Sequence, residues 1–163
     1  MSIFVDGGVD IAMVAHVVAE LNQDSRVGGQ NLFVGQVRAD KHPEGVVTGI
    51  EFSAHREMAD AAVSAFLKRI VGHDHVEPVE PSVDSLADKR ADNPGLALPR
   101  VFIRHGLGLI PVGGSPLFIA VGTERRDEAF RLCREILEAL KSEAPIYGKE
   151  LLDSEGHKWK VNQ

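Results

Sequence analysis

Three stretches of the chain repeat apolar residues at the three- and four-residue spacing of an amphipathic helix. The first begins at Ile11, where Asp10 can cap it, and continues to about residue 21. The second covers about 56–70, and its apolar positions are Met58, Ala62, Phe66 and Ile70. The third covers about 126–143, and its apolar face is Ala129, Phe130, Cys133, Ile136, Leu137 and Leu140. The pattern therefore predicts three amphipathic helices, and we expect the second to pack its apolar face against a sheet.

Four shorter runs have the composition of β-strands, and they cover 32–38, 46–52, 101–105 and 117–121. A turn containing Pro43, Glu44 and Gly45 separates the first two, so we expect those two strands to pair as neighbours. Residues 73–100 contain four of the eight prolines among acidic and small residues, which indicates an irregular insertion. The pattern predicts a single domain of the α/β (α+β) class over residues 1–163.

The third helix has recognisable ends, whereas the tail of the chain does not. Thr123 or Glu124 stands where the first N–H groups of that helix need acceptors, and Pro145 prevents its continuation. Residues 148–163 have too little periodicity for a definite element, although Trp159 suggests that part of the tail packs against the body.

Composition narrows the classes of protein. The 163 residues are 44% hydrophobic, which is enough for one core of ordinary size. A formal net charge of −6 argues against general binding to nucleic acid or to anionic lipid. No apolar run is long enough to cross a bilayer, no secretion signal is recognisable, and the one cysteine cannot form an internal disulfide. We expect a cytoplasmic protein without nucleic-acid or membrane partners.

Basic residues at helix and strand ends are the main chemical candidates. Arg125 and Arg126 precede the third helix, where guanidinium groups and exposed N–H groups can hold a phosphate or carboxylate. The alternative is a solvated surface on which neighbouring acidic residues neutralise both arginines, and local sequence alone favours it. Lys141 suits the negative end of the same helix, and Arg38 closes a predicted strand; both residue types are common there without any functional role.

The remaining nucleophiles and metal ligands give weak signals. Cys133 lies on the apolar face of its helix, so a buried structural thiol is favoured over a sulfur-carrying nucleophile. His73 and His75 are the nearest approach to a ligand pair, but they fall in the insertion, and His55 and His105 complete no tight pattern. We therefore predict no metal site.

Five strings, in order over roughly residues 10–160, resemble the large, catalytic subunit family of molybdopterin synthase. They are Gly28-Gly29 with Phe33-Val34-Gly35-Gln36-Val37-Arg38, Ala54-His55-Arg56-Glu57-Met58-Ala59, His105-Gly106-Leu107-Gly108 with Val112-Gly113, Arg125-Arg126 with Ala129-Phe130 and Cys133, and Leu140-Lys141 with Ala144-Pro145-Ile146-Tyr147. Glu150 and Trp159 continue the register into the tail. The order and spacing of the strings carry more weight than any one of them.

The resemblance implies an α/β hammerhead-like fold with a mainly antiparallel sheet and three main helices. It also implies a homodimer that binds a ubiquitin-like small subunit at each end, giving a heterotetramer. The small subunit carries sulfur as a thiocarboxylate on its C-terminal Gly-Gly, and the substrate is cyclic pyranopterin monophosphate. Two sulfur transfers then produce the dithiolene of molybdopterin, an intermediate of molybdenum cofactor biosynthesis, and no cofactor is bound permanently.

The resemblance also assigns the site, and every position is named here by its number in this chain. The catalytic groups are Lys141 and Lys149. The substrate-binding residues are Arg38, Arg125, Arg126, Gln36, Val37, Gly148 and Glu150. Fixed cations are needed because the substrate phosphate and the developing charge on the acyl oxygen are both negative. We expect Arg38, Arg126 and Lys141 to converge on one pocket.

Two departures from the family pattern leave two readings open. Arg125 replaces the usual histidine, so a titratable imidazole gives way to a permanent cation, and Gly148 replaces the usual substrate-facing lysine. Lys149 compensates only if the backbone turns it inward. One reading is an active sulfurtransferase with a rearranged site. The other is a catalytically impaired paralogue that binds the small subunit or a pterin without turnover.

Overall fold

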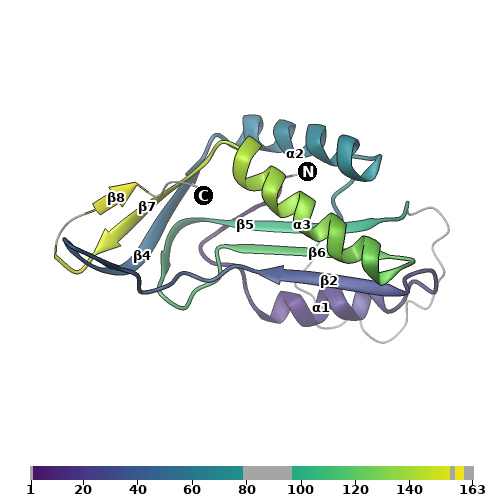
Figure 1. Ribbon diagram of the computed structural model, residues 1–163, viewed down its shortest axis with the longest axis horizontal. Helices are drawn as coiled ribbons and strands as arrows, with labels where there is room; N and C mark the ends of the chain where they lie inside the picture. The colour runs from purple at the N-terminus through teal and green to yellow at the C-terminus, as the bar shows by residue number, and fades with distance from the viewer. Residues whose placement is uncertain (1, 79–96, 155–156, 160–163) are drawn as a thin grey trace.

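The computed structural model describes residues 2–78, 97–154 and 157–159, and within them the chain forms three helices and eight strands (Figure 1). The helices are α1 (Ala12–Leu21), α2 (Arg56–Val71) and α3 (Arg126–Glu143). The strands are β1 (Phe4–Asp6), β2 (Gly29–Val34), β3 (Lys41–His42), β4 (Gly45–Ala54), β5 (Arg100–Pro111), β6 (Leu117–Thr123), β7 (Ile146–Leu152) and β8 (His157–Trp159). None of the described helices combines the length and apolar character needed to span a lipid bilayer.

The strands form a mainly antiparallel sheet in the order β2-β6-β5-β4-β7-β8. β1 adds to β5 in parallel, and β3 adds to β4 as a short hairpin. β5 joins two halves of the sheet. Its first part, Arg100–His105, pairs with β6, and its last part, Gly108–Pro111, pairs with β4. The predicted class, with three helices and a mainly antiparallel sheet, is confirmed.

Helices cover both faces of the half formed by β2, β6 and β5, with α2 and α3 on one side and α1 on the other (Figure 1). The alternation along β5 explains the two layers, since Val101 and Ile103 pack beneath α2 and α3 while Phe102 packs against α1. The other half, β4 with β7 and β8, extends to the left of the view. A separate apolar cluster there includes Val37, Ile110 and Leu152 of three different segments.

The helix predictions are confirmed in extent but partly wrong in orientation. α3 has the predicted bounds, and α2 ends one residue later than predicted. Met58 and Phe130, however, are exposed rather than buried, and Phe130 is 59% exposed. A strict four-residue spacing drifts around a helix of 3.6 residues per turn, so of the four predicted positions only Phe66 is among the buried residues of α2. The buried face is Ala59, Val63, Phe66 and Leu67.

The predicted pairing of strands 32–38 and 46–52 is wrong. β2 pairs with β6, whereas β4 lies between β5 and β7. After β2 the backbone of Gly35 and Val37 bonds to Leu117 and Gly114, so this segment continues along the connection between β5 and β6. The predicted turn around residues 43–45 does form a hairpin, but the partner of β4 is the two-residue β3.

Two predictions about element ends and the tail are also corrected. Neither Thr123 nor Glu124 caps α3, because its N-cap is Arg125, which makes no side-chain cap bond, and the Thr123 hydroxyl donates to the Arg125 carbonyl. Asp10 accepts the Ala12 N–H at 2.9 Å near the start of α1, but the helix begins at Ala12 rather than Ile11, and its N-cap residue is Ile11. Part of the tail packs against the body as predicted, because β7 pairs with β4 and Leu152 is buried, but the Trp159 side chain that suggested this is itself 61% exposed.

A buried charge cluster joins the two ends of the predicted insertion, whose residues 79–96 lie outside the described part of the chain. Glu77 donates its N–H to the Val101 carbonyl at 2.8 Å. The Arg100 guanidinium bonds the Glu77 carboxylate at 3.1 Å and the Glu20 carboxylate of α1 at 2.7 Å. Burial alone would lower the pKa of Arg100, but the two carboxylates raise it above its ordinary value. Arg100 therefore stays charged inside the protein.

Candidate active site

The basic candidates on α3 lie at its two ends. Arg126 begins the helix and Lys141 stands in its last turn. At about 1.5 Å of rise per residue, these positions are about 22 Å apart along the helix axis. The expectation that Arg126 and Lys141 line one pocket therefore fails within a single chain. The structure instead has two separate basic positions on this element.

At the N-terminal end of α3, the backbone at Arg126 packs directly against the start of β2. A Cβ built at Gly29 would lie 2.6 Å from the Arg126 Cα, and one at Gly28 would lie 2.4 Å from the Glu124 carbonyl oxygen. Both positions therefore exclude a side chain, which explains the glycine pair. The Arg126 side chain is 83% exposed, with its Nε 3.6 Å from Asp127, and Arg125 beside it is also exposed.

The segment after β2 presents Gln36 and Arg38 at the surface around a buried anchor. Val37 is buried against Ile110 and Leu152, and its backbone exchanges hydrogen bonds with Gly114 and Gly113. Its side chain is thus not available to a ligand, whereas Gln36 is exposed and donates to the Gly113 carbonyl. Arg38 is 76% exposed and bonds Asp40 at 2.8 Å, a solvated pair that an anion can replace at low cost. Arg38 lies beyond the end of β2 rather than closing a strand.

At the far end of α3, Lys141 lines a shallow cavity of about 470 Å³. The other lining residues are Ser142, Glu143, Ala144, Pro145, Ile146, Tyr147 and Trp159. Tyr147 is 56% exposed and, with Trp159, gives this cavity two large aromatic side chains beside an ammonium group. A negatively charged, planar or extended ligand suits such a surface.

The alternation of β7 separates the remaining candidates onto two faces. Tyr147 and Lys149 share one face, and Lys149 pairs across the strands with Trp159 and lies 4.0 Å from Glu51. Gly148 and Glu150 share the opposite face. Lys149 is thus on the side of the aromatic cavity and does not take the place of a side chain at position 148.

The opposite face of β7 is largely buried. A Cβ at Gly148 would lie 3.2 Å from atoms of both Ile50 and Phe52, so a side chain there must push between them. Glu150 is buried and bonds the His42 Nε2 at 3.0 Å. The sequence analysis missed His42, because 108 residues separate it from Glu150 and no local pattern connects them.

The histidine of the family-like string at 105–108 is not placed to act as an acid or a base. His105 is buried between the rings of Phe4 and Phe52, and burial lowers its pKa despite a hydrogen bond with the Gly106 carbonyl. It is a neutral core residue rather than an exposed base. Across the described ranges, no group of three or more His, Cys, Asp or Glu side chains is arranged to hold a metal ion.

Cys133 is expected to be inert toward thiol reagents in the native protein. Burial raises the pKa of its thiol to about 11, so at pH 8 only about one molecule in a thousand carries the reactive thiolate. An aromatic disulfide reagent should label native protein only as fast as it unfolds, and should label urea-unfolded protein at once. Rapid stoichiometric labelling of the folded chain would contradict the buried structural assignment.

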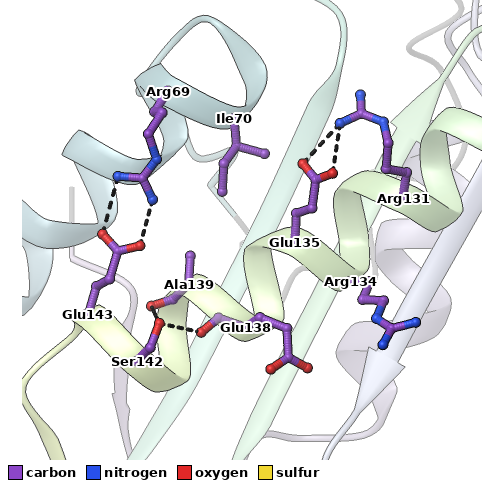
Figure 2. Close-up of a pocket in the computed structure, with 9 residues that line it drawn as sticks. All are labelled: Arg69, Ile70, Arg131, Arg134, Glu135, Glu138, Ala139, Ser142 and Glu143. Atoms are coloured by element: carbon purple, nitrogen blue, oxygen red, sulfur yellow. Dashed lines mark hydrogen bonds and ion pairs between the residues drawn. The ribbon is translucent and has the colours of Figure 1, made fainter.

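A second cavity, of about 530 Å³, lies between α2 and α3, and its charged residues balance one another (Figure 2). Arg69 bonds Glu143 across the two helices, and within α3 Arg131 bonds Glu135, which lies about two turns nearer the start of that helix than Glu143. Its lining is Arg69, Ile70, Arg131, Arg134, Glu135, Glu138, Ala139, Ser142 and Glu143. None of the predicted site residues is among them, and three arginines facing three glutamates provide no net attraction for an anion.

Comparison with solved structures supports the fold. Molybdopterin synthase from Staphylococcus aureus superimposes with a TM-score of 0.68 at 20% identity, covering 98% of this chain and 96% of that one. A chain from a complex of subunits 1 and 2 of molybdopterin-converting factor from Helicobacter pylori gives 0.65 at 18% identity, covering 98% and 90%. At these identities the likeness establishes the fold.

Sequence comparison establishes the family. The molybdopterin synthase catalytic subunit of Caulobacter vibrioides is 28% identical over 132 residues, which is 81% of this chain and 71% of that protein. The subunit of Taeniopygia guttata is 25% identical over 146 residues, covering 90% and 79%. The subunit of Oryza sativa subsp. indica is 34% identical over 67 residues, and this match spans only 34% of the rice protein. The family described as MoaE protein matches residues 9–143, and the chain belongs to this family.

Proposed function

We propose that this protein is an active molybdopterin synthase catalytic subunit. It transfers sulfur from a thiocarboxylated, ubiquitin-like small subunit to cyclic pyranopterin monophosphate. The observation that carries the proposal is Lys141, an exposed lysine at the end of α3 that lines an open cavity beside two aromatic side chains. Membership of the family supports the same reaction. Two relatives that carry this name align with 81% and 90% of this chain.

The chemistry assigns a distinct task to Lys141. Each transfer exchanges a carbon–oxygen bond of the pterin side chain for a carbon–sulfur bond, with the displaced oxygen leaving as water or on the phosphate. Water then cleaves the acyl–sulfur bond, which leaves the sulfur on the pterin and an ordinary carboxylate on the partner. Negative charge develops on the acyl oxygen during this cleavage, and a fixed ammonium group stabilises it. Lys149, on the same side of β7 as Tyr147, contributes to the positive field near the cavity.

A homodimer completes the site in this proposal, because one chain cannot bring Arg126 to Lys141. Within the described residues β2 pairs only with β6, so its outer edge is open to another strand. If a second copy adds antiparallel at this edge, Gly29 of one copy lies beside Val34 of the other. Arg126, packed on Gly29, then approaches Arg38 of the second copy. α3 and β2 run toward the same side of the molecule (Figure 1), which suits a site with Arg38 and Lys141 from one copy and Arg126 from the other.

Mixing inactive variants tests this shared site. Arg38→Ala and Arg126→Ala dimers should each be inactive, but co-expressed chains should recover about a quarter of wild-type activity. The reason is that about half of the dimers are mixed, and each mixed dimer has one intact site of two. Product formation at equal dimer concentration is the measurement.

The matched control mixes Arg38→Ala with Lys141→Ala, two changes assigned to the same half of the site. Every site in those mixed dimers lacks one of the two groups, so activity should not return. Recovery in both mixtures, or in neither, would contradict the assignment of Arg126 to the second copy.

The second candidate is a paralogue that binds the small subunit or a pterin without turnover. Arg125 and Gly148, where the family resemblance expects histidine and lysine, favour this candidate. The assay supplies thiocarboxylated small subunit and cyclic pyranopterin monophosphate, and measures dithiolene product. Absence of product under conditions where an ordinary homologue turns over would replace the first proposal with the second.

A further inference from the structure

Tyr147 and Trp159 form an aromatic pair that the proposed chemistry does not use. They stand on neighbouring strands, both line the Lys141 cavity, and both are more than half exposed. The register explains the arrangement, because Trp159 pairs with Lys149, which shares a face of β7 with Tyr147. Large exposed aromatic side chains are costly in water and are typical of binding surfaces.

The charge around this pair favours an anionic chain end. Lys141 brings a positive charge to the cavity, and Lys149 lies on the adjoining part of the same face. Among the described residues that line the cavity, Glu143 is the one acidic residue, and its carboxylate is engaged by Arg69 of α2. The cavity thus combines a cation with flat apolar walls, a combination that suits an anionic ligand with a planar backbone.

We propose that Tyr147 and Trp159 are the walls that accept the glycine-ended tail of the small subunit and exclude tails with side chains. This inference rests on the proposed function. Glycine has no Cβ, so its peptide planes can lie flat against aromatic rings, while the terminal thiocarboxylate meets Lys141. A methyl group on either glycine would hold the backbone away from the rings. Tyr147 and Trp159 are thus positioning residues that determine specificity for the partner.

The chain contains a single tryptophan, so intrinsic fluorescence reports directly on this cavity. The probe is a small subunit with a C-terminal Gly-Gly carboxylate, in which its own tryptophans are replaced by phenylalanine. Binding should change the emission of Trp159, and a partner whose penultimate glycine is alanine should bind about tenfold or more weakly. An unchanged emission spectrum on formation of a stable complex would overturn the inference.

Kinetics separate positioning from catalysis. Trp159→Ala and Tyr147→Ala should each raise the KM for the thiocarboxylated partner by about 10- to 100-fold, with kcat changed by less than about threefold. Trp159→Phe should restore most of the affinity, since it keeps an aromatic wall. Met58→Ala, which removes another exposed apolar side chain from α2, is the matched control and should leave KM unchanged.

The outcomes distinguish this inference from the proposed function. If KM for the partner stays at the wild-type value in both alanine variants while product forms, the aromatic walls are wrong and the sulfurtransferase remains. If wild-type protein neither binds the partner nor forms product, the proposed function itself fails. Thermal melting of each variant excludes loss of folding as the cause of a raised KM.

Discussion

Lys141→Ala is expected to lower the rate of sulfur transfer by about 100- to 1000-fold. The ammonium group lies where the acyl oxygen becomes negative, and loss of one such donor typically costs this much in kcat. Lys141 is exposed in the last turn of α3, so its removal should leave the melting temperature nearly unchanged. Single-turnover formation of dithiolene product, with saturating partner and pterin, is the measurement.

Two further lysine variants make the result specific. Lys68→Ala removes an exposed lysine of α2 that pairs with Asp74, and it should have wild-type activity. Lys149→Ala should have a smaller effect than Lys141→Ala, because Lys149 lies near Glu51 and acts only through the field. If Lys141→Ala retains more than about a third of the activity, catalysis by this lysine is excluded.

The largest expected effect on stability comes from Arg100. Arg100→Leu should lower the free energy of unfolding by about 3–5 kcal/mol, because it leaves the buried Glu77 carboxylate without its counter-charge. Urea unfolding at neutral pH, followed by circular dichroism, gives the difference. The double variant Arg100→Leu, Glu77→Leu should recover part of the loss, since the Glu77 carboxylate is then no longer buried without Arg100.

An exposed ion pair provides the matched comparison. Arg69 bonds Glu143 on the surface between α2 and α3, and Arg69→Leu should cost less than about 1 kcal/mol. Equal losses for Arg69→Leu and Arg100→Leu would mean that burial of the Arg100 cluster does not determine its contribution.

The helices could be predicted from sequence because their signal is local. The bounds of α3 follow from an apolar period with a following proline, and those of α2 follow from its apolar period alone. Strand partners could not be predicted, since β2 and β6 meet across about ninety residues and nothing local distinguishes β6 from β4 as the neighbour. The exposure of Phe130 and Trp159 also depends on which elements approach them, which periodicity does not contain.

The site was predictable in its residue types more than in its geometry. Local sequence selected Arg126 and Lys141 as helix-end cations, and the length of the predicted helix already implied that they are far apart. The contacts of Glu150 could not be anticipated, because His42 reaches it only through the β3–β4 hairpin beside β7. The two faces of β7 likewise follow from its pairing with β4, which the sequence did not predict.

The ion pair between Glu77 and Arg100 affects how much the length of the chain between these two residues can differ among relatives. It ties together the two points at which the chain leaves and rejoins the sheet, next to the Glu77 N–H bond to Val101. In general, the entropic cost of closing an insertion on a fixed base grows only logarithmically with its length, by about 0.6 kcal/mol for each doubling. Evolution can therefore add or delete residues there at little thermodynamic cost, and relatives with much shorter or longer segments at this point can share one scaffold.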